Sequence, residues 1–130
     1  MEKQQEVMYK LAMFEQQIQQ LQQQLQAVEK GLVELGNLNF GLDELQGGTG
    51  KEIMSPIGQG IFAKTKLLSE DLIVDIGGKN FVKKSVPETR KLIEEQIKKL
   101  DEIKKDLQKG IDEMGKEFEK ILREEIEKKQ

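Results

Sequence analysis

Apolar residues recur along the first 35 positions of the chain with alternating steps of four and three residues. The mean spacing of about 3.5 residues is typical of a coiled coil, in which these positions form the seam facing a partner helix. Glutamine, a good helix former, fills ten of the first 26 positions and keeps the remaining surface polar. The predicted seam residues are Val7, Leu11, Phe14, Ile18, Leu21, Leu25, Val28, Leu32 and Leu35.

The helical signal weakens after this seam. Gly31, Gly36 and Gly41 each cost a helix about 1 kcal/mol relative to alanine, and the apolar spacing slips by one residue. We expect the helix to bend or end within residues 36–46, ahead of the glycine-rich break at residues 47–50.

A second heptad pattern occupies residues 86–130. Ser85 and Glu88, with Pro87 between them, predict a capping box that starts this helix. Lys and Glu alternate on its outer face, which is typical of a solvated surface rather than of a binding patch. Eight of its ten seam positions are apolar: the set is Ile93, Ile97, Leu100, Lys104, Leu107, Ile111, Met114, Phe118, Ile121 and Glu125.

Between the two heptad segments the apolar period changes to two, which is the period of a β-strand. Four short strands are expected, over residues 51–57, 61–68, 72–76 and 81–85, joined by glycine-rich or polar turns. Proline has no N–H to donate, so Pro56 places the first strand at an edge or at a bulge.

The predicted fold is therefore mainly α with a small β block, an antiparallel two-helix coiled coil joined by two β-hairpins. We expect one domain over residues 1–130, with the N-terminal coiled-coil helix in 1–46, the hairpins in 51–85 and the C-terminal coiled-coil helix in 86–130. Because the hairpins lie midway along the chain, the helices double back and bring both termini to the far end.

Four short strands leave open edges and faces with little to cover them, and isolated hairpins are marginally stable in water. We therefore expect obligate oligomerisation through the hairpins. The residues expected to take part are Ile53, Ile57, Ile61, Phe62, Leu67, Leu72, Val74, Ile76, Phe81 and Val82.

Composition narrows the chemistry that the chain can perform. The 130 residues include no Cys and no His, which removes thiolate and imidazole ligands and most hydrolytic triads. The 21 basic and 24 acidic residues form no clustered positive face of the kind that nucleic-acid binding needs. No run approaches the roughly 18 apolar residues of a membrane span. We expect a cytoplasmic protein with no metal, cofactor, nucleic-acid or membrane partner.

The hairpin block carries a more specific signal. The segments Ser55–Phe62 (SPIGQGIF) and Val74–Lys84 (VDIGGKNFVKK) resemble the two hairpins of the archaeal alpha-class subunits of prefoldin. In that family a Pro-Ile/Val-Gly-x-Gly-x-aromatic pattern marks the first hairpin, and a glycine turn before a Lys-ended strand marks the second. Two hairpins rather than one distinguish alpha from beta subunits, and the resemblance covers the whole chain.

The resemblance implies that two alpha-class subunits join four beta-class subunits through their hairpins, which form an oligomeric β-barrel. It also implies an ATP-independent molecular chaperone, a holdase that binds non-native client proteins at the coiled-coil tips and transfers them to a group II chaperonin. The candidate client-binding residues, all near the termini, are Val7, Met8, Tyr9, Leu11, Met13, Leu122 and Ile126. Methionine suits a promiscuous surface, but Met8 and Met13 fit a widened helix interface equally well.

Two other functions stay open at this point. A structural coiled-coil subunit that self-assembles through its hairpins into a filament or spacer would need the same fold. An enzyme is less well supported, because residues 47–51 lack the first Gly and the Ser or Thr of a phosphate loop. The Gly58–Gly60 segment also precedes a predicted strand, whereas a dinucleotide-binding motif opens a helix.

Overall fold

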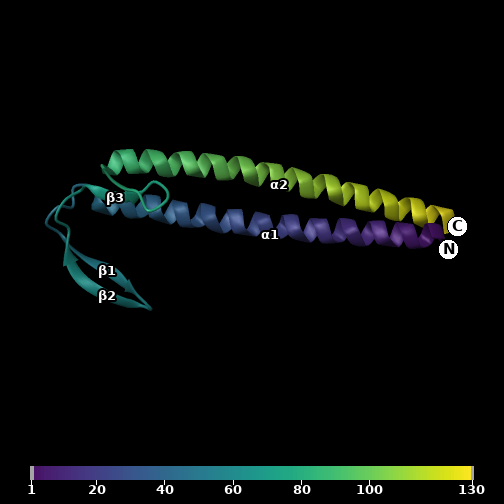
Figure 1. The fold of residues 1–130 in the computed structure, drawn as a ribbon, viewed down its shortest axis with the longest axis horizontal. Helices are drawn as coiled ribbons and strands as arrows, with labels where there is room; N and C mark the ends of the chain where they lie inside the picture. The colour runs from purple at the N-terminus through teal and green to yellow at the C-terminus, as the bar shows by residue number, and fades with distance from the viewer. Residues whose placement is uncertain (1, 130) are drawn as a thin grey trace. The chain divides into compact units, whose positions relative to one another are not determined.

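The computed structural model describes residues 2–129, which form two long helices and four short strands. The predicted order of helix, two hairpins and helix is confirmed, with strand ends that differ from the predicted ones by one or two residues. The elements are α1 (Glu2–Leu45), β1 (Glu52–Gly58), β2 (Ile61–Lys66), β3 (Leu72–Asp75), β4 (Phe81–Lys84) and α2 (Val86–Lys129) (Figure 1).

The chain divides into two compact units. The first combines Met1–Leu32 with Lys99–Gln130, and the second is Val33–Lys98. Both helices contribute to each unit, whereas the hairpins belong to the second alone. The single domain expected over residues 1–130 stays a prediction.

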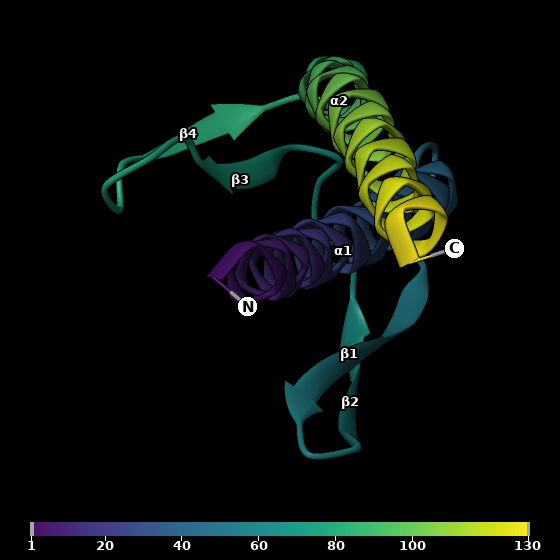
Figure 2. The same ribbon diagram turned by 90° about the vertical axis from the view of Figure 1, so that its right-hand side faces the viewer.

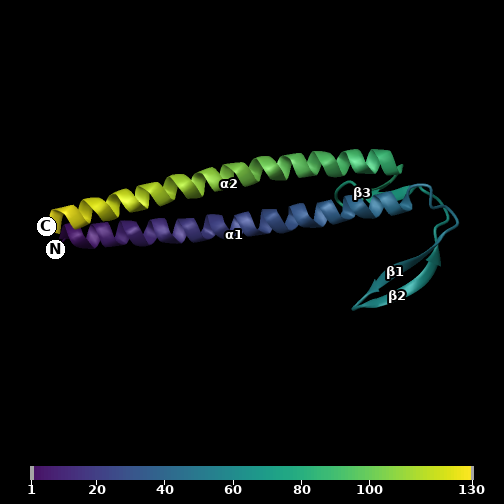
Figure 3. The same ribbon diagram turned by 180° about the vertical axis from the view of Figure 1, so that it is seen from behind.

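In the first unit the two helix segments lie side by side and run in opposite directions, with the first residues of α1 beside the last residues of α2 (Figures 1 and 3). Every predicted seam residue of this unit is half-buried, including the charged Lys104 and Glu125. The heptad interpretation of both segments is therefore confirmed. Two helices alone cannot enclose a seam, so none of these side chains is fully buried.

Glycine notches on both helices set the register of this pair. The Cδ1 atom of Leu100 lies 3.3 Å from where a Cβ on Gly31 would stand, and the Cδ1 atom of Leu21 lies 3.7 Å from the same place on Gly110. A leucine of each helix thus approaches the backbone of the other. A shift of register would remove both leucines from their notches.

The glycines of the first helix do not interrupt it, contrary to the expected weakening. α1 is helical through Gly36 and Gly41 and ends at Leu45, inside the predicted range for its end. Its last turns are held by tertiary packing, because Leu42 lies in the core of the second unit and Leu45 packs against that core. Such packing outweighs the intrinsic cost of glycine in a helix.

The core of the second unit is small and lies between the helices. It consists of Leu42 of α1 with Val86 and Ile93 of α2, all buried. Leu72, the first residue of β3, packs against it and so anchors the second hairpin to the helix pair.

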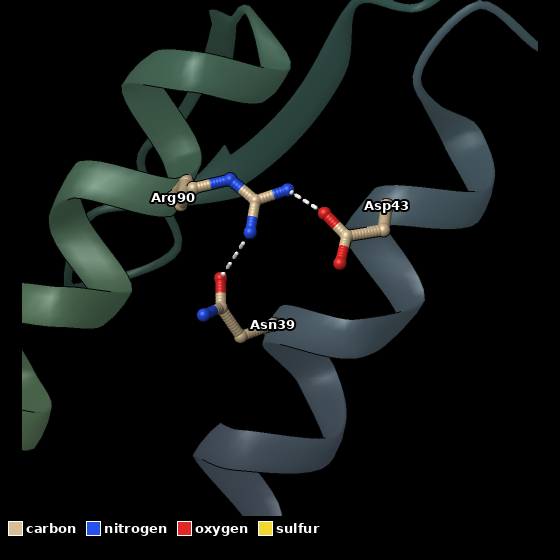
Figure 4. A network of polar contacts seen from close by, with 3 residues as sticks. All are labelled: Asn39, Asp43 and Arg90. Atoms are coloured by element: carbon tan, nitrogen blue, oxygen red, sulfur yellow. Dashed lines mark hydrogen bonds and ion pairs between the residues drawn. The ribbon is translucent and has the colours of Figure 1, made fainter.

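Polar contacts fix the start of α2. The Glu88 backbone N–H donates to the Ser85 hydroxyl at 3.2 Å, and that hydroxyl donates to the Glu88 carboxylate at 3.0 Å. This confirms the predicted Ser85 cap of the helix. Glu88 contacts the Ser85 hydroxyl, whereas in a full capping box it accepts from the Ser85 backbone N–H. One turn later, the Arg90 guanidinium donates to the Asn39 side-chain oxygen at 3.0 Å and forms an ion pair with Asp43 (Figure 4). Arg90 therefore holds the first turns of α2 against α1.

The four strands form two separate antiparallel hairpins, β1 with β2 and β3 with β4. The register shifts between Pro56 and Gly58, in agreement with the edge or bulge expected at the proline. Figure 2 shows the hairpins projecting from the helices of the second unit in different directions. Within the described residues, each two-stranded sheet leaves both of its outer edges unpaired.

Candidate functional site

An apolar groove lies between the ends of the two helices in the first unit. Its volume is about 290 Å³, at the lower limit of the roughly 300–1,000 Å³ typical of small-molecule sites. This size suits individual apolar side chains better than a large cofactor. The residues that line it are Gln4, Val7, Met8, Leu11, Leu122, Glu125 and Ile126.

The groove is open because the coiled-coil seam ends in polar residues. Glu125 holds a seam position on α2, and Gln4 precedes Val7 by three residues and so continues the seam of α1. Neither polar side chain supplies the apolar knob that would close this last layer of the coiled coil. The apolar side chains around it are left without a full set of partners.

The apolar residues of the groove differ in exposure according to their place on the helix. Val7 and Leu11 belong to the seam and are half-buried. Met8 and Ile126 lie beside the seam, and 70% and 57% of their surface is exposed. Leu122, on the same side of α2, is also exposed. A contiguous exposed patch of this kind is a typical feature of protein-binding surfaces.

The structure brings together five of the seven residues predicted to bind clients. Val7, Met8 and Leu11 share one face of α1 and meet Leu122 and Ile126 of α2. Their grouping follows from helix geometry, since side chains three or four residues apart are neighbours on a helix. Met8 and Val7 lie three and four residues before Leu11, and Leu122 lies four residues before Ile126.

The other two predicted residues lie outside the groove. Tyr9 is exposed and lines a separate shallow hollow on α1 with Glu2, Gln5 and Glu6. Met13 is exposed but does not line the groove. A role of these two residues in client binding stays a prediction.

Sequence reasoning missed Gln4 and Glu125 as parts of this site. The signal was present in the heptad pattern, where both occupy positions that the other layers fill mostly with apolar residues. Their amide and carboxylate are the polar groups that line the groove. The site therefore offers apolar burial with a polar edge.

Other chemistries find little support in the described part of the chain. Residues 2–129 contain no group of three or more potential ligand side chains that could hold a metal ion. None of the described helices combines the length and the apolar character that crossing a bilayer requires.

The hairpins carry a second apolar surface. Of the residues predicted to mediate oligomerisation, five are exposed: Ile57, Ile61, Phe62, Ile76 and Phe81. The other five are half-buried: Ile53, Leu67, Leu72, Val74 and Val82. The prediction omitted three exposed apolar residues of the same block, Met54, Leu68 and Ile73.

Comparison with known proteins agrees with this architecture. The model of the prefoldin subunit family matches residues 14–130. Prefoldin subunit alpha of Methanobrevibacter smithii is 34% identical over 110 residues, covering 84% of this chain and 70% of that protein. Prefoldin subunit alpha of Methanosphaera stadtmanae is 32% identical over 80 residues, covering 62% of this chain and 58% of that protein, less than two thirds of its length.

The fold is also similar to a solved structure, that of filamentous PFD from Methanocaldococcus jannaschii. The TM-score is 0.75 at 23% identity, and the match covers 87% of this chain and 95% of that one. The family model spans most of the sequence, and the relatives above are archaeal alpha subunits. The chain therefore belongs to the prefoldin family, a family of chaperones rather than of enzymes, and within it to the archaeal alpha class.

Proposed function

We propose that this chain is a subunit of a cytoplasmic, ATP-independent holdase that binds non-native proteins in the groove at the helix ends and passes them to a group II chaperonin. The observation that carries the proposal is the exposed apolar wall formed by Met8, Leu122 and Ile126. Unfolded chains expose apolar side chains that such a wall buries. Membership in a chaperone family supports the same conclusion.

The size of the groove favours weak binding by each subunit. Burying one Leu- or Phe-sized side chain contributes about 1.5–3 kcal/mol, which alone gives only a short-lived complex. Several subunits joined in one assembly would hold one client at several points, so that avidity supplies the affinity. The flexible side chain of Met8 adapts to clients of different shape. Such binding is reversible without nucleotide hydrolysis, as transfer to a chaperonin requires.

We propose further that the hairpins join this subunit to beta-class subunits, as two alpha with four beta, in a shared β-barrel. The unpaired outer edges of both hairpins in the described chain support this assembly, because an open edge pairs readily with another strand. The exposed Ile57, Ile61 and Phe81 would be removed from water by the same contact.

A pair of serine substitutions in the groove tests client binding. The assembly with Met8→Ser and Ile126→Ser in this chain should lose most of its ability to slow the aggregation of an unfolded client in the absence of ATP, measured by light scattering. The matched control is Ile103→Ser, which removes a 46%-exposed side chain of α2 that does not line the groove. If the unsubstituted assembly, the double variant and the control suppressed client aggregation equally, at unchanged native mass, binding at the groove would be contradicted.

A second candidate is a structural subunit that polymerises through its hairpins into a filament or spacer. It is favoured by the fold similarity to filamentous PFD of Methanocaldococcus jannaschii. Native mass spectrometry separates the two functions. A species of two copies of this chain with four copies of a beta-class partner supports the holdase. Growth of the chain alone into very large species with rising concentration supports the filament.

A further inference from the structure

A second apolar stripe lies on α1, in the unit that carries the hairpins. Val33 and Phe40, seven residues apart on one face, are 63% and 75% exposed. They are about 200° around the helix from Leu35 and Leu42, which pack in the core with residues of α2, so they point away from α2. Glu44 extends the stripe by one turn beyond Phe40 and is exposed too.

The outer face of the first hairpin has a matching pattern. Phe62 and Lys64 are two residues apart and lie on the same face of β2. Their pairing partners on β1 are Pro56 and Met54, respectively. All four side chains are exposed. The hairpin therefore presents three apolar side chains next to a cation.

The spacing and charge of the two surfaces agree. Phe40 and Glu44 are separated by about 6 Å along α1, and Phe62 and Lys64 by about 6.8 Å along β2. A strand laid along the helix can thus place the two aromatic rings and the two opposite charges in contact together. Residues 33–45 contain three acidic and no basic residues, whereas residues 51–85 contain six basic and four acidic ones.

We propose that the α1 stripe of Val33, Phe40 and Glu44 binds the outer face of the first hairpin of a second copy of this chain. The hairpin of the same chain leaves the stripe exposed. In the second unit the β1–β2 hairpin projects on the side of α1 away from α2 (Figures 1 and 2), where a second copy related by a two-fold axis can reach it. The inference rests on the proposed assembly through hairpins and adds a helix–strand contact to it.

The chain has no cysteine, so an engineered pair reports the contact directly. Two differently tagged full-length copies, one with Phe40→Cys and one with Phe62→Cys, are co-expressed and mildly oxidised. We expect a disulfide-linked dimer that carries both tags. The matched control replaces Phe40→Cys by Leu38→Cys, which is also exposed but lies about 200° away around α1, and it should not link.

Two further variants test the same contact in solution. Phe40→Ser should weaken self-association about 10-fold or more without loss of helical circular dichroism, because the ring is exposed in the single chain. Glu44→Lys should weaken it less, and adding Lys64→Glu to the same chain should restore it.

The following results of the cross-linking experiment would overturn the inference. The two substitutions are also placed together in one chain. A disulfide that forms only within that chain, and not between the two singly substituted copies, would assign the stripe to its own hairpin. An equal yield with Leu38→Cys would show that the link is unspecific. An assembly of unchanged mass that forms no link would refute this contact alone, whereas a chain that stays monomeric would refute the proposed hairpin assembly as well.

Discussion

Individual glycines have different roles in the two helices. Gly31 and Gly110 receive leucines of the opposite helix, so their lack of a side chain serves packing. Gly115, in contrast, has nothing within 4 Å of the place where a Cβ would stand. It carries the helix-propensity cost of glycine without a packing benefit in the single chain.

We predict different effects of two Gly→Ala substitutions on the free energy of unfolding. Gly115→Ala should raise the free energy of unfolding by about 0.5–1 kcal/mol, because alanine fits an open helical position. Gly31→Ala should gain less or lose stability, because its Cβ would meet Leu100 Cδ1 at 3.3 Å and the leucine would have to shift. Urea unfolding followed by circular dichroism measures both. A larger gain from Gly31→Ala would show that its notch does not constrain the packing.

At the scale of the elements, the helix segments of the first unit form a heptad seam whose last layer is polar. The layers from Leu11 to Leu32 bury apolar side chains against α2, whereas Gln4 and Glu125 leave the final layer open. The groove is thus a place where the coiled coil is incompletely packed. Stability is reduced there, and an apolar surface remains for a partner.

Filling that layer with apolar side chains should stabilise the coiled coil and weaken client binding. The double substitution Gln4→Leu and Glu125→Leu places apolar knobs at both seam positions and should raise the free energy of unfolding by about 1–3 kcal/mol. Client capture should fall because the new side chains occupy the groove. Thermal unfolding and an aggregation assay on the same samples check the two effects. A more stable variant with stronger capture would argue against the groove as the binding site.

At the scale of the whole molecule, the two proposed surfaces use different residues in different units. The groove belongs to the unit of residues 1–32 and 99–130, and the hairpins belong to the unit of residues 33–98. Client binding and assembly should therefore be separable by mutation.

Deleting residues 1–13 removes the α1 wall of the groove and leaves the hairpins intact. We expect the native mass of the assembly to fall only by the deleted residues, while aggregation suppression is lost. The converse variant, Ile61→Glu with Phe81→Glu, places charges on the exposed apolar hairpin surface and should prevent assembly. Loss of assembly on deletion of residues 1–13 would instead assign a structural role to the helix ends.

The sequence by itself determined the order of the elements, the seam residues and the start of α2. These features depend on local patterns: a 3.5-residue period, a period of two, and a Ser85–Glu88 cap whose partners are three residues apart. Five of the seven proposed groove residues also followed, because both helix ends must meet when the chain doubles back.

Only the tertiary structure decided how those patterns combine. It kept α1 helical through Gly36 and Gly41, because burial of Leu42 against α2 outweighs the local propensity. It also turned Leu72 towards the core of its own unit and excluded Tyr9 from the groove. Each of these outcomes depends on contacts between residues far apart in the chain, whereas periodicity describes only the environment of neighbours.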